Sequence, residues 1–194
     1  MKGRIKERAR AGVRPLARGL LRAGVTPNGL TGFGLAISAG AGVLFAMGWF
    51  RWGALALLVG GLADMLDGAV ARAGGKSSVF GAFFDSSMDR LAELAVFTGY
   101  MAYFFREGSL LYAVLCFLAA GGSFAVSYTR ARAEGLGLAC EVGWMERPER
   151  LVTLIVASAV GPVGVRAALW VLTALVTWTT WQRIRHVYRE TRTP

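Results

Sequence analysis

Six apolar stretches, each close to the length of a membrane span, constrain the fold more than any other feature of this chain. A transmembrane helix needs about 20 mainly apolar residues, and only helices and closed barrels satisfy their backbone hydrogen bonds inside a bilayer. Hydrophobic residues make up 55% of the 194 positions, and the mean hydropathy is +0.47. The sequence predicts an all-α membrane protein with six transmembrane helices, at about 28–48, 52–73, 78–105, 109–133, 148–164 and 166–186.

A basic segment precedes the first span. Residues 2–22 carry Lys and Arg around most of a helix circumference, with apolar side chains such as Leu16 and Leu20 toward one side. The segment is too charged to span, so we expect an amphipathic interfacial helix on the membrane surface, within residues 1–24. It lacks the short apolar core and cleavage site of a signal peptide. We expect one domain over 1–194, with a six-helix core at 28–186.

The positive charges gather on one side of this topology. Six spans place both termini on the same side, and eighteen of the 22 Lys and Arg residues fall there. The positive-inside rule therefore puts both termini in the cytoplasm. The net charge of +10 is concentrated at the ends of apolar spans. We accordingly expect contact with anionic membrane lipids and no nucleic-acid partner.

Four aspartates, the only ones in the chain, lie within or beside the second and third spans. On helices, the spacing of Asp64 and Asp67 and the spacing of Asp85 and Asp89 each place two carboxylates on one face. Carboxylates among apolar residues are costly unless they are compensated. Oxygen-only ligands suit Mg²⁺, Mn²⁺ or Ca²⁺, so this pattern predicts a divalent metal site toward the cytoplasm.

The residues between these aspartates complete a longer pattern. It runs from Asp64 and Asp67-Gly68 through Ala71-Arg72 and, after eight residues, to Gly81, Asp85 and Asp89. The pattern resembles, position for position, the signature of the CDP-alcohol phosphotransferase family. This resemblance implies a membrane enzyme, usually dimeric, that moves a substituted phosphate from a CDP-linked donor to an alcohol and releases CMP. It also implies six transmembrane helices behind an amphipathic helix.

The same resemblance implies roles for individual residues. Asp64, Asp67 and Asp85 would bind two divalent cations, Mg²⁺ or alternatively Mn²⁺, and Asp89 would complete the second site and act as general base. The donor would lie against the bare backbone of Gly68 and Gly81, next to Ala71, with Arg72 at a phosphate. Asn28 and Thr31 open the first span, where they would either touch the nucleotide or cap the helix.

Residues outside the signature bear on the acceptor. The segments 127–134 and 146–150 resemble bacterial phosphatidylinositol phosphate synthases, a branch of this family that joins CDP-diacylglycerol to inositol phosphate. That likeness implies that Arg130, Arg150 and Arg183 hold the phosphate of the acceptor. Arginine forks bind phosphate bidentately, which fits a phosphorylated polyol. The alternative is that Arg130, Arg132, Arg147 and Arg150 are positive-inside anchors, or that Arg147 and Arg150 pair with Glu146 and Glu149.

Several alternatives stay open from the sequence. That branch often has Lys at the position of Arg130 and Asp at the position of Asn28, so glycerol 3-phosphate remains a candidate acceptor, which would make the protein a phosphatidylglycerophosphate synthase. The donor could also be an archaeal-type ether lipid linked to CDP, or a CDP-linked polyol. Outside the enzyme class, the carboxylates would suit a cation transporter or channel.

Overall fold

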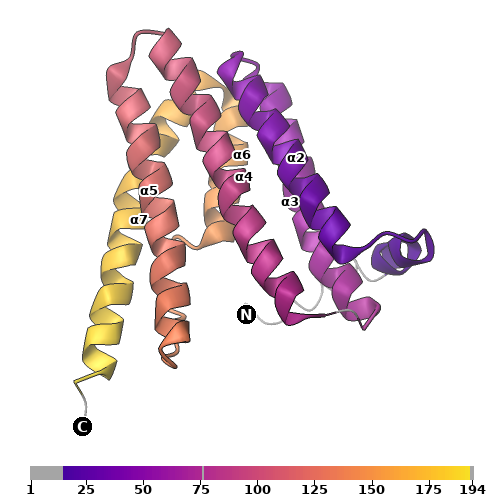
Figure 1. Cartoon of the computed structure of the whole chain (residues 1–194). Coiled ribbons are helices and arrows are strands. Elements are labelled where there is room, and N and C mark those ends of the chain that lie inside the picture. Colours follow the sequence, from indigo (N-terminus) through magenta and orange to yellow (C-terminus); the bar gives the residue numbers. More distant parts are fainter. Residues whose placement is uncertain (1–14, 76, 193–194) are drawn as a thin grey trace. The chain divides into compact units, whose positions relative to one another are not determined.

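The computed structural model describes residues 15–75 and 77–192, and this part of the chain is entirely α-helical apart from its connections (Figure 1). Residues 15–22 are helical, whereas the earlier part of the predicted interfacial helix lies outside the described residues. The longer helices are α2 (Pro27–Ala46), α3 (Phe50–Ala73), α4 (Val79–Arg106), α5 (Leu110–Gly135), α6 (Arg147–Val160) and α7 (Pro162–Glu190).

Local sequence explains the start of α2 and the break between α6 and α7. Thr26 caps α2, because its Oγ1 accepts a hydrogen bond from the backbone N–H of Gly29 at 3.2 Å. The sixth helix was predicted to begin near residue 166, and this prediction is wrong. The break lies at Gly161, which has a φ of +106°, a region that favours glycine. Pro162 then starts α7, since the first helical position does not need a backbone N–H.

Four of the described helices, α2, α3, α5 and α7, are long and apolar enough to cross a membrane, so the chain is an integral membrane protein. The predicted number was six. The helix α4 does not qualify because Asp85, Asp89, Arg90 and Glu93 interrupt its apolar sequence. The helix α6 has 14 residues, which is shorter than the roughly 20 needed for a bilayer core.

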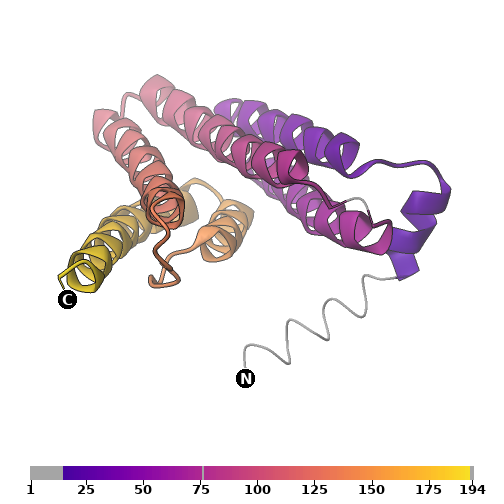
Figure 2. The same cartoon turned by 60° about the horizontal axis from the view of Figure 1, so that its bottom comes forward.

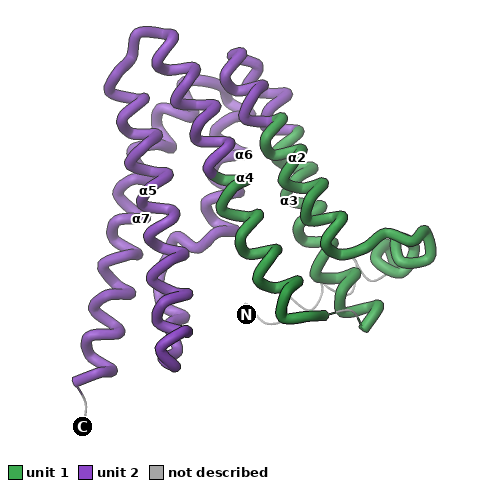
Figure 3. Tube along the Cα trace, viewed as in Figure 1, with its two compact units in different colours: residues 1–40, 56–93 green, residues 41–55, 94–194 purple. Residues whose placement is uncertain are grey.

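The described chain divides into two compact units (Figure 3). The first comprises 1–40 and 56–93, and therefore contains the start of α2, most of α3 and the first half of α4. Within it, α2 and α3 approach closely: a Cβ added to Gly60 would lie 2.7 Å from Ser38 Oγ and 3.3 Å from the carbonyl oxygen of Gly34. This is the packing that small residues permit in membrane helices.

The second unit comprises 41–55 and 94–194. In it α5 lies alongside α7, and α6 also packs on α7 (Figures 1 and 2). The backbones of Gly42 on α2 and Gly99 on α4 meet so closely that neither position has room for a side chain. A buried aromatic pair, Phe45 and Tyr100, with ring centroids 4.4 Å apart, fills the core beside them.

Candidate active site

Three carboxylates converge in the first unit. Asp64 and Asp67 lie one turn apart on α3, Asp85 lies on α4, and each offers an oxygen within 4.8 Å of the other two. Asp67 is 5% exposed, and the other two are half-buried. Negative charges so close repel each other, and burial adds to the cost of the charged forms. A divalent cation offsets both penalties, so this oxygen-only set could hold Mg²⁺, Mn²⁺ or Ca²⁺.

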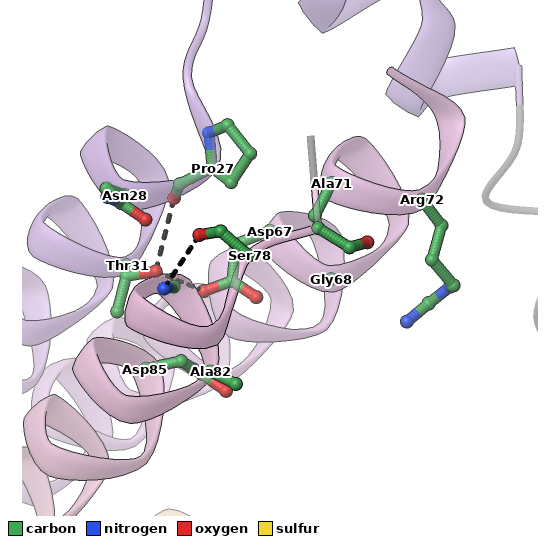
Figure 4. Close-up of a pocket in the computed structure, with 12 residues that line it drawn as sticks. Pro27, Asn28, Thr31, Asp67, Gly68, Ala71, Arg72, Ser78, Ala82 and Asp85 are labelled. Carbon is green, nitrogen blue, oxygen red and sulfur yellow. Dashed lines mark hydrogen bonds between the residues drawn. The ribbon is translucent and has the colours of Figure 1, made fainter. Parts of the chain in front are cut away.

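Thr31 on α2 orients one of these carboxylates. Its Oγ1 donates a hydrogen bond to Asp67 Oδ2 at 2.6 Å, and both side chains are buried (Figure 4). The carbonyl oxygen of Pro27, 3.1 Å away, is a second acceptor for the same hydroxyl. The hydrogen bond favours the charged carboxylate and limits its rotation. From the sequence, Thr31 was expected to contact the nucleotide or to cap a helix, and its contact with Asp67 was not predicted.

A cavity of about 190 Å³ opens beside Asp67 and Asp85, between the start of α2, the end of α3 and the start of α4 (Figure 4). The residues predicted to bind the donor all line it. They come from three separate stretches of the sequence: Asn28 and Thr31, then Gly68, Ala71 and Arg72, then Gly81. The structure thus brings the predicted set together, while its part in binding stays a prediction.

The two glycines of the set have polar groups next to them. A Cβ on Gly68 would lie 3.1 Å from Arg72 Nη1, and one on Gly81 would lie 3.6 Å from Asn28 Oδ1. Ser78, which was not among the predicted site residues, also lines the cavity and accepts a hydrogen bond from the Gly81 N–H at 2.9 Å. A serine directly before an apolar helix is a common N-cap, and that pattern could have identified it.

Asp89 lies one helical turn beyond Asp85 on α4 and is half-buried. Its position four residues on keeps it on the same face of the helix as Asp85. Among the described residues, the group of three carboxylates that approach each other does not include Asp89. Its expected roles as metal ligand and general base therefore stay predictions.

The predicted acceptor-binding arginines all belong to the second unit. Arg130, near the end of α5, pairs with Glu134 at 2.8 Å on a partly exposed face. Arg150 on α6 is 1% exposed, and its Nη1 donates to the carbonyl oxygen of Met145 at 3.2 Å. Arg150 is therefore buried within the second unit, and its role at the acceptor stays a prediction.

Arg183 on α7 is 2% exposed and makes several contacts with backbone. Its Nε donates to the carbonyl oxygen of Val142 at 2.8 Å, and its Nη1 donates to that of Val126. The charges of Arg130 and Arg150 act on Arg183, so the three arginines occupy one region of this unit. Glu134 and Glu146 lie in the same region, and the three arginines there could also hold an anionic ligand.

The sequence is similar to those of known proteins. The sequence model of the family described as CDP-alcohol phosphatidyltransferase matches residues 24–182. The phosphatidylinositol phosphate synthase of Mycobacteroides abscessus is 42% identical over 184 residues, which are 89% of this chain and 82% of that protein. The archaetidylinositol phosphate synthase of Methanothermobacter thermautotrophicus is 40% identical over 164 residues, covering 82% and 80%.

Solved structures give a similar result. The chain superposes on the phosphatidylinositol phosphate synthase of Mycobacterium tuberculosis with CDP-DAG bound, with a TM-score of 0.85 and 34% identity over 91% of this chain and 93% of that one. The complex of the same enzyme with manganese and citrate gives a TM-score of 0.83 and 35% identity, covering 91% of this chain and 88% of that one.

Proposed function

Because this chain belongs to the CDP-alcohol phosphatidyltransferase family, we propose that it transfers the phosphatidyl group of CDP-diacylglycerol to an inositol phosphate and releases CMP. Membership in this family makes the protein an enzyme and decides against the cation transporter. The observation that carries the proposal is the cluster of Asp64, Asp67 and Asp85, of which Asp67 and Asp85 line a cavity together with the predicted donor contacts.

The carboxylate cluster fits a metal-dependent reaction. Bound divalent cations would neutralise the diphosphate of the donor and stabilise charge on the attacked and leaving oxygens. Asp64, Asp67 and Asp85 would hold them, and Asp89 would complete the second site. Mg²⁺ suits these ligands, and the manganese in the relative's structure supports Mn²⁺ as an alternative.

The chain's own residues would bind the donor and move one proton. Gly68 and Gly81 leave room for the donor to approach the backbone, with Arg72 at the edge of the cavity for a phosphate. Asp89 would take the proton of the acceptor hydroxyl, whose oxygen forms a bond to the phosphorus of the diacylglycerol phosphate. The bond from that phosphorus to the CMP oxygen breaks, and CMP leaves.

The arginines supply the reason for a phosphorylated acceptor. Such a substrate brings about two negative charges, and guanidinium groups bind phosphate in two-pronged hydrogen bonds. Arg130, Arg150 and Arg183 interact electrostatically within one unit, which supports their joint assignment to this phosphate. An unphosphorylated acceptor would bring no anionic group to these three arginines. Glycerol 3-phosphate is the competing acceptor, and the archaeal relative makes an ether-lipid donor the competing donor.

The membrane topology follows from the number of spanning helices. We infer that α4 and α6 cross the membrane with the other four helices, behind the surface helix, and that one catalytic domain spans residues 1–194. Both termini and the active site would then face the cytoplasm of a bacterial-type cell membrane. A cysteine introduced at Ser109 and one introduced at Gly137 should be labelled from opposite sides of a vesicle. Labelling of both from one side would contradict this topology. We also propose that the enzyme acts as a homodimer. The molar mass of the purified protein in detergent, corrected for bound detergent, tests this.

The decisive experiment measures CMP released by the purified protein from CDP-diacylglycerol with Mg²⁺ or Mn²⁺. The acceptors are inositol phosphate, glycerol 3-phosphate and unphosphorylated inositol, and a second series replaces the donor with CDP-archaeol. We expect the highest kcat/KM with CDP-diacylglycerol and inositol phosphate. Preference for glycerol 3-phosphate would overturn the acceptor assignment, and preference for CDP-archaeol would overturn the donor assignment.

A further inference from the structure

Within the second unit, one face of α7 holds the connection between α5 and α6. The connection covers residues 136–146, and the face is formed by Thr179, Arg183 and His186. Their spacings of four and three residues place them one above another on the same side of a helix. Each of them makes a hydrogen bond with the backbone of the connection.

The three contacts follow the chain in order. His186 Nε2 lies 3.0 Å from the carbonyl oxygen of Ala139, and because a carbonyl only accepts, this nitrogen is the one that donates. Arg183 Nε donates to the carbonyl oxygen of Val142 at 2.8 Å. The hydroxyl oxygen of Thr179 accepts the N–H of Met145 at 3.1 Å. The connection is therefore fixed at its beginning, middle and end.

The packing is as close as the hydrogen bonds indicate. Gly143 adopts a φ of +130°, and a Cβ there would lie 2.5 Å from Thr179 Cγ2 and 3.5 Å from Arg183 Nε. Thr179 is fully buried. Backbone and helix thus meet without room for another side chain.

The end of the connection leads directly into α6. Met145, whose N–H is held by Thr179, offers its carbonyl oxygen to Arg150 Nη1 at 3.2 Å. One residue, Met145, therefore joins α7 on one side to a proposed acceptor-binding arginine on the other. Glu146, which follows, approaches Arg183 Nη2 at 3.8 Å.

We propose that Thr179 and His186 are positioning residues for the acceptor site: together with Arg183 they fasten the connection to α7 and thereby place Arg150. The inference rests on the proposed function in so far as Arg150 binds the acceptor's phosphate. Neither Thr179 nor His186 needs to touch a substrate. Their effect is expected in acceptor binding, because the donor contacts belong to the other unit.

The experiment uses the full chain in detergent or lipid nanodiscs and compares Thr179→Val with Thr179→Ser and with Thr177→Val. The valine removes the hydroxyl at nearly constant volume, and the serine retains it. Thr177 is an exposed threonine of α7 whose hydroxyl bonds only to the carbonyl oxygen of Thr173 among the described residues, so it serves as the matched control. A second pair, His186→Ala and His186→Gln, tests the other end of the connection by removing or retaining a donor.

Two readouts are measured on each variant, namely amide hydrogen exchange of residues 139–146 and the KM for acceptor and donor. Thr179→Val should exchange faster there and raise the KM for inositol phosphate about tenfold, a smaller effect than the ~100-fold that a misplacement of about 1 Å can cause. The KM for CDP-diacylglycerol and kcat should stay within twofold. Thr179→Ser and His186→Gln should restore wild-type values, and Thr177→Val should keep them.

Unchanged exchange in both Thr179→Val and His186→Ala would overturn the fastening itself. Faster exchange with an unchanged acceptor KM would show that the contacts only stabilise the fold, and would overturn the positioning role. If the wild-type protein releases no CMP with inositol phosphate, the proposed function is wrong. The proposed role of Thr179 and His186 in acceptor binding by Arg150 is then wrong as well. Hydrogen exchange would still decide whether α7 holds the connection.

Discussion

Replacing Thr31 with valine tests whether the hydroxyl beside Asp67 prepares the carboxylate cluster for a cation. Valine has nearly the shape of threonine, so the exchange removes the 2.6 Å hydrogen bond to Asp67 Oδ2 and the weaker 3.1 Å contact with the Pro27 carbonyl oxygen at nearly constant volume. A buried hydrogen bond to a charged group contributes about 1.5–3 kcal/mol. Because about 1.4 kcal/mol corresponds to a factor of ten, the loss predicts that the Kd for Mn²⁺ rises roughly 10- to 100-fold. Neighbours of metal ligands have effects of the same size in other proteins.

The assay is a titration of the purified protein with Mn²⁺, followed by the paramagnetic resonance of the free ion, and in parallel by CMP release as a function of Mn²⁺ concentration. Thr31→Ser retains the hydroxyl and should bind Mn²⁺ nearly as well as the wild type. Thr98→Val is a control for the chemical exchange, because that hydroxyl donates to the carbonyl oxygen of Leu94 on its own helix. A Kd for Mn²⁺ in Thr31→Val within twofold of the wild type would refute the reasoning.

Three further changes address the base, the packing and the cap. Asp89→Asn should reduce CMP release at least ~100-fold without changing the melting temperature; activity within tenfold of the wild type would exclude Asp89 as the base. Gly99→Ala would push a Cβ into the backbone of Gly42 and should lower the free energy of unfolding by roughly 1–3 kcal/mol. Gly121→Ala, whose Cβ would meet no described heavy atom within 4 Å, should melt like the wild type, and equal melting of both variants would contradict the packing argument. Ser78→Ala removes the cap of α4, which contributes about 1 kcal/mol to stability, and should raise the KM for the donor. An unchanged donor KM would show that this cap does not contribute to donor binding.

Features that depend on near neighbours in the chain were predictable. The cap at Thr26 is of this kind, because its hydrogen bond reaches only to Gly29, three residues further on. The helical spacing of Asp64 and Asp67 places both on one face whatever surrounds them. The end of α6 was missed although it is also local. Gly161 and Pro162 were the available signal, and they outweigh the continuous apolar sequence around them.

The sequence by itself determined the all-α membrane character, the carboxylate spacing and the family, because these follow from composition and from helix periodicity over a few residues. Only the tertiary structure brought Asp85 to Asp64 and Asp67, and paired Thr31 with Asp67 across 36 positions. It likewise decided that Arg150 and Arg183 are buried and bonded to backbone. The physical reason is that helix periodicity fixes which residues share a face, whereas packing between helices decides which faces meet.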